Sequence, residues 1–216
     1  MNASAPAKKP EPRTNDPERT QADILTVATR EFSEKGFAGA RVDLIAEATR
    51  TSKRMIYYYF GSKEGLYLKV LEDAYGRIRQ TESALRLEDL EPVEALRTLV
   101  RFTVDYERTH PDFIRLVMNE NIQRGASLAR STTIQQRNAT AIDGIKAVYQ
   151  RGVAAGVFRP GLDPVDLHMS ISALSFFNVS NRHTFALIFQ RDMDSPEAVA
   201  QRRENVVEML LRYVSV

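Results

Sequence analysis

From Asp16 to the C-terminus the sequence is marked out as a succession of helices, and this pattern restricts the fold more than any other feature. Three segments open with a capping residue followed by proline, at Asp16-Pro17, Asp163-Pro164 and Ser195-Pro196. Asp or Ser accepts an unpaired N–H of the first turn, and proline has no N–H to leave unpaired there. The sustained alternation of apolar and polar residues that is typical of strands is found nowhere in the chain. The sequence therefore predicts an all-α protein.

The spacing of apolar residues, together with glycine and proline punctuation, sets the expected helices. A first helix carries Ile24, Ala28 and Phe32 on one stripe and ends at Gly36. Short segments follow and then longer ones, with expected ranges of 42–49, 53–60, 63–80, 91–108, 111–123, 126–155, 164–190 and 195–214.

Composition excludes several classes of protein. Of the 216 residues 43% are hydrophobic and 27% are charged, as in an ordinary globular protein. The absence of cysteine excludes a disulfide scaffold, a thiolate metal site and a cysteine nucleophile. The longest uncharged stretch, residues 167–181, is too short and too polar to span a bilayer. No apolar run follows the first methionine, so we expect no secretion signal, no membrane partner and a cytoplasmic location.

Residues 1–17 contain four prolines together with Lys8, Lys9 and Arg13, and almost nothing apolar beyond Ala and Met. Such a segment cannot bury enough surface to offset the entropy lost on ordering. We expect a flexible basic arm. The alternative is a solvated tail without a partner, and whether the arm touches DNA is left open.

Two short segments joined by Thr49-Arg50-Thr51, with a helix before them, have the geometry of a helix-turn-helix. In the second segment Ile56 and Phe60 share one face and are expected to pack inward. The side chains then left to solvent are two cations and two tyrosines, namely Lys53, Arg54, Tyr57 and Tyr58.

This exposed set suits the surface of a DNA duplex. Between Arg50 and Lys63 there are four basic residues and no acidic one. Cations neutralise phosphates and tyrosine hydroxyls donate to phosphate oxygens, while the start of such a helix reads base edges in the major groove. The alternative is a solvated basic face whose aromatic rings lie against neighbouring helices.

The same region resembles a known family. The segments that carry the likeness are Phe32-Ser33-Glu34-Lys35-Gly36-Phe37, Ile45-Ala46-Glu47, Ser52-Lys53 and Tyr57-Tyr58-Tyr59-Phe60-Gly61-Ser62-Lys63-Glu64-Gly65-Leu66. In order and spacing, over about residues 18–68, they resemble the tetracycline-repressor (TetR) family of transcriptional regulators.

The resemblance implies a helix-turn-helix DNA-binding domain at residues 18–66 and an α-helical ligand-binding and dimerisation domain at residues 67–216. It further implies a homodimer that represses by binding a near-palindromic double-stranded operator and is released by a small-molecule effector of unknown identity. Residues 41–60 become the helix-turn-helix and 53–60 its recognition helix. The expected DNA-contacting residues are Arg41, Arg50, Ser52, Lys53, Arg54, Met55, Tyr57, Tyr58 and Lys63.

Two departures from the family pattern matter. The family's turn is usually Ala-Gly-Val, whereas Arg50 occupies the glycine position here. Either Arg50 adopts a left-handed conformation at a cost of ~1 kcal/mol or the turn differs. Arg54 and Met55 stand where the family often has a small residue and Thr. Arg54 is suited to pair with guanine and Met55 to touch a thymine methyl.

The C-terminal part yields weaker expectations. No cluster of buried charge is readable, which favours an apolar or aromatic effector. The candidate pocket residues are Phe102, Tyr106, Met118, Asn121, Tyr149 and Phe176, although residues of these types are more often ordinary core side chains. The last two segments carry more apolar residues than one protomer can cover, which favours a two-fold interface. The alternative is that these helices complete the core of the protomer. Its candidate residues are Leu174, Phe177, Leu187, Val206 and Leu210.

The competing interpretations are an all-helical enzyme and an adaptor that does not bind DNA. Against an enzyme, the chain has no H-E-x-x-H, G-x-S-x-G, Walker or Rossmann motif. His110, His168 and His183 follow no metal-ligand spacing. We therefore expect no catalytic residues, no cofactor and no metal.

Overall fold

The computed structural model describes residues 16–216, so the predicted arm at residues 1–17 lies, apart from Asp16 and Pro17, outside the described residues. Within that range the fold is all-α, as predicted, and no strand is formed. The elements in chain order are α1 (Pro17–Gly39), α2 (Val42–Ala48), α3 (Lys53–Phe60), α4 (Lys63–Ser83), η1 (Leu87–Asp89), α5 (Pro92–Thr109), α6 (Pro111–Ile122), η2 (Leu128–Arg130), α7 (Thr132–Ala154), α8 (Pro164–Ser180), α9 (Arg182–Phe189) and α10 (Pro196–Val214).

The three predicted cap-and-proline openings are confirmed. Asp16, Asp163 and Ser195 each accept a backbone N–H of the following first turn, at 3.0, 2.8 and 3.3 Å. The predicted end of the first helix coincides with a kink, because Gly36 adopts a φ of 66° inside α1.

Two expected helices are in fact interrupted. The range 126–155 contains η2 before α7 begins, because Ser131 accepts the N–H of Ile134 at 3.2 Å and starts a new helix. The range 164–190 is split between α8 and α9 at Asn181, whose side chain donates to the Ser180 hydroxyl at 2.8 Å. Asn and Ser side chains bond locally in this way and compete with helical backbone geometry.

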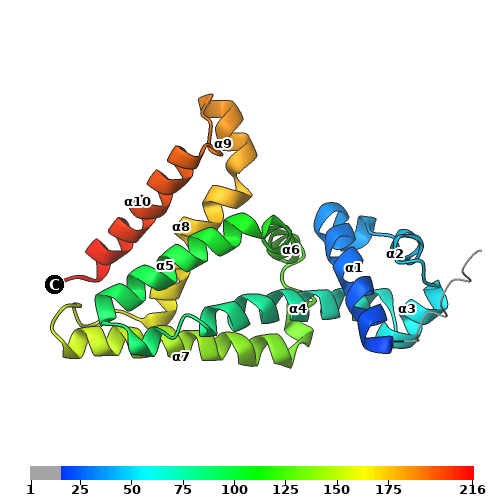
Figure 1. Cartoon of the computed structure of the whole chain (residues 1–216), viewed down its shortest axis with the longest axis horizontal. Helices are drawn as coiled ribbons and strands as arrows, with labels where there is room; N and C mark the ends of the chain where they lie inside the picture. Colours follow the sequence, from blue (N-terminus) through cyan, green and yellow to red (C-terminus); the bar gives the residue numbers. More distant parts are fainter. Residues whose placement is uncertain (1–15) are drawn as a thin grey trace, which may run out of the picture.

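The arrangement of the helices places the helix-turn-helix at one end of the molecule. In Figure 1, α1, α2 and α3 lie together at the right, and α4 runs from them into the remaining helices, where it packs beside α7. On the opposite side α10 packs across α5 and α8, and α9 extends away from the body. Among residues 16–216 no helix has the length and hydropathy that a membrane crossing requires.

Buried side chains form two cores. The first joins α1, α2, α3 and α4 to α6 and contains Ile24, Phe32, Ile56 and Leu66. The second joins α5, α7, α8 and α10. Phe102 packs against both. Helix α6 therefore belongs to the C-terminal part of the chain but shares its core with the helix-turn-helix.

Candidate nucleic-acid interface and effector cavity

Helix α3 presents its polar face to solvent because its apolar face is held by the first core. Ser52 caps the helix by accepting the N–H of Met55 at 3.2 Å. Ile56 is fully buried, whereas Tyr57 and Tyr58 are 41% and 77% exposed. Arg54 is exposed and Met55 half-buried. The predicted division of this helix into an inward and an outward face is confirmed.

The turn before α3 is fixed by backbone hydrogen bonds. After the end of α2, Thr51 N–H donates to the Ala46 carbonyl at 3.0 Å and Arg50 N–H to the Glu47 carbonyl at 3.1 Å. This pairing closes a helix end through one left-handed residue. Arg50 is that residue, with a φ of 50°, so the first of the two predicted options for the turn is confirmed.

An acidic residue that the sequence interpretation missed lies within the predicted DNA-binding set. Asp43 on α2 forms an ion pair with Lys53 and lies 3.9 Å from the guanidinium of Arg41. The backbone N–H of Arg41 donates to Glu31 of α1 at 3.0 Å. Arg41 and Lys53 are thus brought together around one carboxylate, and only the position of Asp43 in the first turn of α2 hinted at this.

Lys63 lies at the first position of α4, where Ser62 caps the helix by accepting the N–H of Gly65 at 3.1 Å. Its ammonium group sits over the ring of Phe37, 4.9 Å from the ring centre. Unpaired N–H groups and the helix dipole make such a helix start attractive to a phosphate. The lysine adds a full positive charge at the same place.

A cavity of about 340 Å³ lies in the C-terminal part between α4, α5, α6, α7 and α8. Of the predicted pocket residues it is lined by Phe176. Tyr106 is buried and stacks on His110 at 3.9 Å. Met118 and Asn121 are exposed on α6. The predicted residues are therefore not brought together around this cavity.

Tyr149 has a structural role instead. Its ring packs in the second core, and its hydroxyl donates to the Arg159 carbonyl at 2.9 Å and accepts the Leu162 N–H at 2.9 Å. These two bonds hold the loop between α7 and α8. Tyr149 therefore does not line the cavity, because its hydroxyl is used in these two bonds. Its position in the sequence did not reveal this role.

The expectation of a pocket without buried charge is wrong. The cavity is lined by an Arg79–Glu82 ion pair on α4 and by Glu107 on α5, which is only 4% exposed. Atom Oε2 of Glu107 is buried without a hydrogen-bond partner among residues 16–216, and so is Nε of Arg79. The charged residues escaped detection because they lie on separate helices, and each resembles an ordinary surface residue in the sequence.

Burial governs the protonation of these groups. Desolvation raises the pKa of Glu107 to about 8, although the charge of Arg79 opposes the shift. Burial also raises the pKa of Glu82, which Arg79 partly offsets. On the α8 side, burial lowers the pKa of His168, and Arg79 adds to that effect. Near neutral pH the uncharged forms of Glu107 and His168 are therefore favoured.

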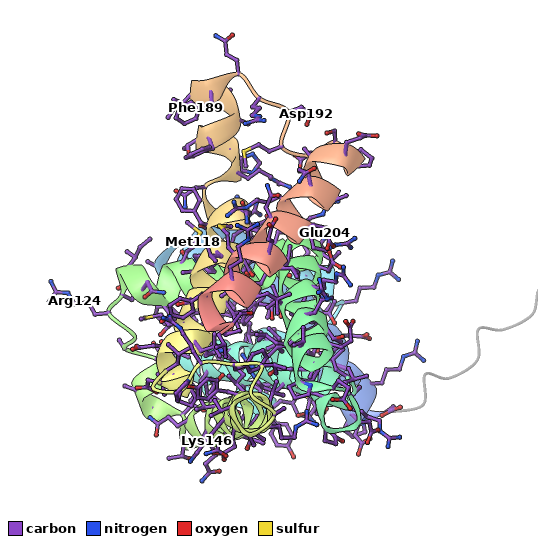
Figure 2. All side chains as sticks on the ribbon, turned by 90° about the vertical axis from the view of Figure 1, so that its left-hand side faces the viewer. Met118, Arg124, Lys146, Phe189, Asp192 and Glu204 are labelled. Atoms are coloured by element: carbon purple, nitrogen blue, oxygen red, sulfur yellow. The ribbon has the colours of Figure 1, made fainter. Side chains whose placement is uncertain are left out.

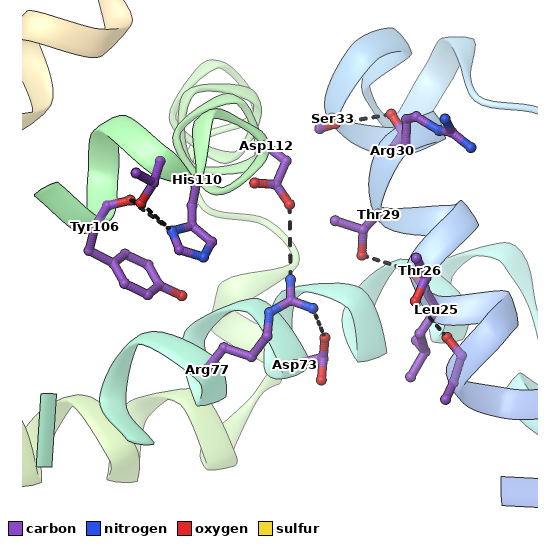
Figure 3. A network of polar contacts seen from close by, with 12 residues as sticks. Leu25, Thr26, Thr29, Arg30, Ser33, Asp73, Arg77, Tyr106, His110 and Asp112 are labelled. Carbon is purple, nitrogen blue, oxygen red and sulfur yellow. Dashed lines mark hydrogen bonds and ion pairs between the residues drawn. The ribbon is translucent and has the colours of Figure 1, made fainter. Parts of the chain in front are cut away.

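Helix α6 connects the cavity to the helix-turn-helix. Phe113 and Val117 line the cavity, while Asn119 donates to the Phe32 carbonyl of α1 at 3.3 Å. Figure 3 shows the neighbouring polar contacts, in which Arg77 of α4 lies 2.7 Å from Asp73 and 4.0 Å from Asp112 of α6. A molecule in the cavity thus touches two helices, α4 and α6, that also pack against α1.

The predicted interface residues divide into two groups. Phe177 and Leu187 are 45% and 79% exposed, and Leu174 is half-buried. Val206 and Leu210 are buried, so their assignment to an interface is corrected: they face α5 and α8 within the protomer. Large apolar side chains exposed on the same helices are Met169, Phe185, Ile188, Phe189, Met209 and Tyr213. Figure 2 shows α9, with Phe189, standing clear of the rest of the molecule.

Comparison with known proteins agrees with both parts of this architecture. The family model for bacterial regulatory proteins of the tetR family matches residues 24–70, and the model for the tetracyclin repressor-like C-terminal domain matches residues 92–210. The HTH-type transcriptional repressor NicS of Pseudomonas putida is 34% identical over 200 residues, which cover 93% of this chain and 94% of that protein. RutR of Escherichia coli is 34% identical over 150 residues, 69% of each chain.

Solved structures share the fold. The protein SCO4942 from Streptomyces coelicolor aligns with a TM-score of 0.68 and 27% identity, over 90% of this chain and 98% of that chain. AibR, solved with isovaleryl coenzyme A and operator DNA, aligns with a TM-score of 0.68 and 21% identity, over 89% and 98% of the two chains. With a C-terminal family model over more than half of its length and a relative along nearly all of it, the chain belongs to the TetR family of bacterial transcriptional regulators.

Proposed function

We propose that this chain is a repressor that binds a near-palindromic DNA operator as a homodimer and leaves it when a small molecule occupies the cavity between α4 and α8. The observation that carries the proposal is the outward face of α3, where Arg54, Tyr57 and Tyr58 are exposed while Ile56 anchors the helix. A repressor among the relatives, similar along nearly the whole chain, supports repression as the outcome of binding.

In this proposal residues 18–66 bind DNA, and residues 67–216 bind the effector and form the dimer. In the first part, Arg54 and Met55 read bases, and the phosphate contacts fall to the flanking cations and tyrosines. The phosphate contacts include Arg41 and Lys53, for which DNA phosphates compete with Asp43. Neutralising DNA phosphates releases the counterions condensed on the duplex. This release favours contacts of the two cations with DNA over their contacts with an exposed carboxylate.

Dimerisation is proposed through the exposed apolar side chains of α8, α9 and α10. Scattered exposed apolar residues are normal, but a set shared by consecutive helices is typical of an interface. A two-fold axis through this surface makes each protomer offer the same patch to the other. Two recognition helices then read half-sites about one turn of DNA apart, roughly 34–36 Å, which requires a near-palindromic operator.

Release is proposed to act through α4 and α6. A ligand that binds better when the two α3 helices are wrongly spaced for DNA shifts the population towards that state. A hundredfold change in operator occupancy needs about 2.7 kcal/mol of coupling, which is within the usual range for allosteric proteins. The route runs from the cavity wall at Phe113 and Val117 to the contact between Asn119 and Phe32.

The test begins with selection of binding sites from random duplex DNA, followed by fluorescence anisotropy on the recovered site. We expect the selected sites to share a palindromic consensus, each site to bind one dimer, and the affinity to fall steeply as the salt concentration rises. An adaptor or an enzyme predicts no enrichment of any sequence and no binding even at low salt. Either of these last results would contradict the proposed function.

A further inference from the structure

The cavity between α4 and α8 is lined by a buried acidic side chain with an oxygen atom that no described residue pairs with. Glu107 is 4% exposed, and its Oε2 has no hydrogen-bond partner among the described residues. A buried polar atom without a hydrogen-bond partner destabilises the protein, because it has lost its bonds to water without replacement. Because Glu107 lines the cavity, a ligand there can supply the missing partner.

Two further polar groups of the cavity restrict the chemistry of a matching ligand. The Thr103 hydroxyl donates to the Leu99 carbonyl at 2.9 Å, so it retains only acceptor capacity towards the cavity. On α4, Nε of Arg79 is a donor without a hydrogen-bond partner among the described residues. With Glu107 protonated, these groups offer acceptors and one donor on α5 and another donor on α4, so a matching ligand carries both an N–H group and an oxygen acceptor.

The charges of the cavity balance without a ligand. Arg79 is neutralised by its ion pair with Glu82, both on α4. Glu107 on α5 and His168 on α8 favour their uncharged forms, because burial raises the pKa of Glu107 to about 8 and lowers that of His168. The lining residues of α6 and α7 carry no charge. A charged ligand would lose its hydration here without gaining an opposite charge that is unpaired.

The shape also restricts the ligand. A volume of about 340 Å³ is at the small end of the range for ligand sites. Tyr75, Phe113 and Phe176 contribute aromatic walls from three different helices. Aromatic walls favour planar rings, which stack face to face or edge to face against them.

We propose that this cavity binds a small, planar, uncharged molecule with an amide-type edge, whose N–H donates to Glu107 and whose carbonyl oxygen accepts from the protein. A protonated carboxyl group has a donor and an acceptor side by side, so it can pair with such an edge through two hydrogen bonds. The inference rests on the proposed function only in calling this ligand the effector. Binding itself can be measured on the free protein.

Three molecules of nearly the same shape separate the alternatives. Benzamide has the amide edge and no charge, benzamidinium has N–H donors and a positive charge, and benzoate has acceptors and a negative charge. Calorimetric titration of the full chain at pH 6.5, without DNA, is expected to show benzamide binding about tenfold more tightly than either charged isostere. Equal or tighter binding of benzoate or benzamidinium, or no binding of benzamide at millimolar concentration, overturns the proposal.

Two variants assign the effect to Glu107. Glu107→Leu is expected to weaken benzamide binding about tenfold, the usual result of losing one good hydrogen bond. Glu107→Gln keeps a donor and an acceptor, so it should retain binding and hold it constant to pH 9, whereas binding to the wild-type chain weakens as Glu107 ionises. Glu208→Leu on α10 is the matched control, and thermal unfolding checks that each variant is folded. Unchanged benzamide affinity in Glu107→Leu contradicts the assignment.

The proposed function has a separate readout. If benzamide binds as expected but the selected operator is neither bound nor released, the ligand class stands and the regulatory role fails. If the operator is bound but benzamide is not, the repressor stands and the ligand class fails.

Discussion

Arg50 adopts a strained backbone conformation directly after α2. It ends α2 with a φ of 50°, a conformation that glycine adopts freely and other residues adopt at a cost. Its side chain is exposed, so no packing in the protomer repays that cost. A contact with a DNA phosphate would explain why arginine stands there.

Relief of this backbone strain can be measured. Arg50→Gly should raise the free energy of unfolding by about 1 kcal/mol, because the left-handed residue is relieved. The same change should weaken binding to all DNA sequences alike and reduce the salt slope by about 1, as expected for a lost phosphate contact. Urea denaturation and anisotropy at several salt concentrations measure the two effects. Unaltered DNA affinity would leave the strain without a functional reason.

Arg54 should act on sequence rather than on phosphates. Its side chain is exposed on the first turn of α3, the part of a recognition helix that reaches base edges. Arg54→Ala should cost about 1–3 kcal/mol on the selected operator and relax specificity at one base pair. Lys146→Ala, which removes an exposed charge from α7, is the control. Equal losses on operator and random DNA would mean that Arg54 contacts phosphate only.

Glu107 makes stability depend on pH with a definite sign. Its pKa is about 8 in the folded chain and about 4.3 when unfolded, so between these values the folded state binds the extra proton. Stability should therefore fall as pH rises, by up to about 1.4 kcal/mol per pH unit from this group, and level off above pH 8. Glu107→Gln should match the wild-type chain near pH 4 and exceed its stability at pH 8.5, as measured by urea denaturation. A constant difference across that range would show that Glu107 is ionised throughout.

At the scale of elements, the junction of α3 and α4 sets how the recognition helix is aimed. A Cβ atom built on Gly65 would collide with the carbonyl oxygen of Phe60, the last residue of α3. The absence of a side chain at Gly65 thus allows the end of α3 and the start of α4 to approach closely. This close approach explains why the motif Phe60-Gly61-Ser62-Lys63-Glu64-Gly65 ends in glycine.

Gly65→Ala should therefore force the two helices apart. We expect a loss of about 1–3 kcal/mol in stability, the usual cost of overpacking, together with weaker operator binding. Gly144→Ala is the control, because that glycine lies within α7 with open space around it. There the added methyl group should stabilise the helix by roughly 0.5–1 kcal/mol. Denaturation of both variants decides the matter, and equal stabilisation would contradict the proposed close approach.

Local signals predicted most elements but not their interruptions. Caps such as Ser52 and Asp163 act within three residues, so they are visible in the sequence and are confirmed. The breaks at Ser131 and Asn181 also have local causes, but Ser and Asn occur inside helices as well. The helical spacing of apolar residues continues across both sites, so the sequence pattern did not reveal the two breaks.

At the scale of the whole molecule, prediction from the sequence reached its limit. The exposed face of α3 follows from helical periodicity, whereas the pairing of Asp43 with Lys53 and the gathering of Arg79 and Glu107 depend on how helices pack. For the same reason Val206 and Leu210 could not be told apart from surface residues of α10. Contacts between residues far apart in the chain produce no periodic pattern in the sequence, so periodicity cannot predict them.

Assembly can be tested with two matched apolar residues. Ile188 on α9 and Ile122 at the end of α6 are 70% and 73% exposed. Ile188→Asp should convert the proposed dimer to monomers and weaken operator binding, because a charge would be buried without a partner. Ile122→Asp should change neither property. Analytical ultracentrifugation gives the mass of each variant, and a dimeric Ile188→Asp would place the interface elsewhere.

Helix α4 has 21 residues and runs from the cavity to the junction with α3. At 1.5 Å per residue it is about 30 Å long, so a tilt of about 5° at one end displaces the other end by roughly 2.6 Å. That displacement is close to the length of a hydrogen bond, so it is enough to break the register of side chains with base edges. Rearrangements too small to alter the packing of the cavity walls can therefore have a full effect at the operator, and the magnification comes from the geometry of a stiff rod alone.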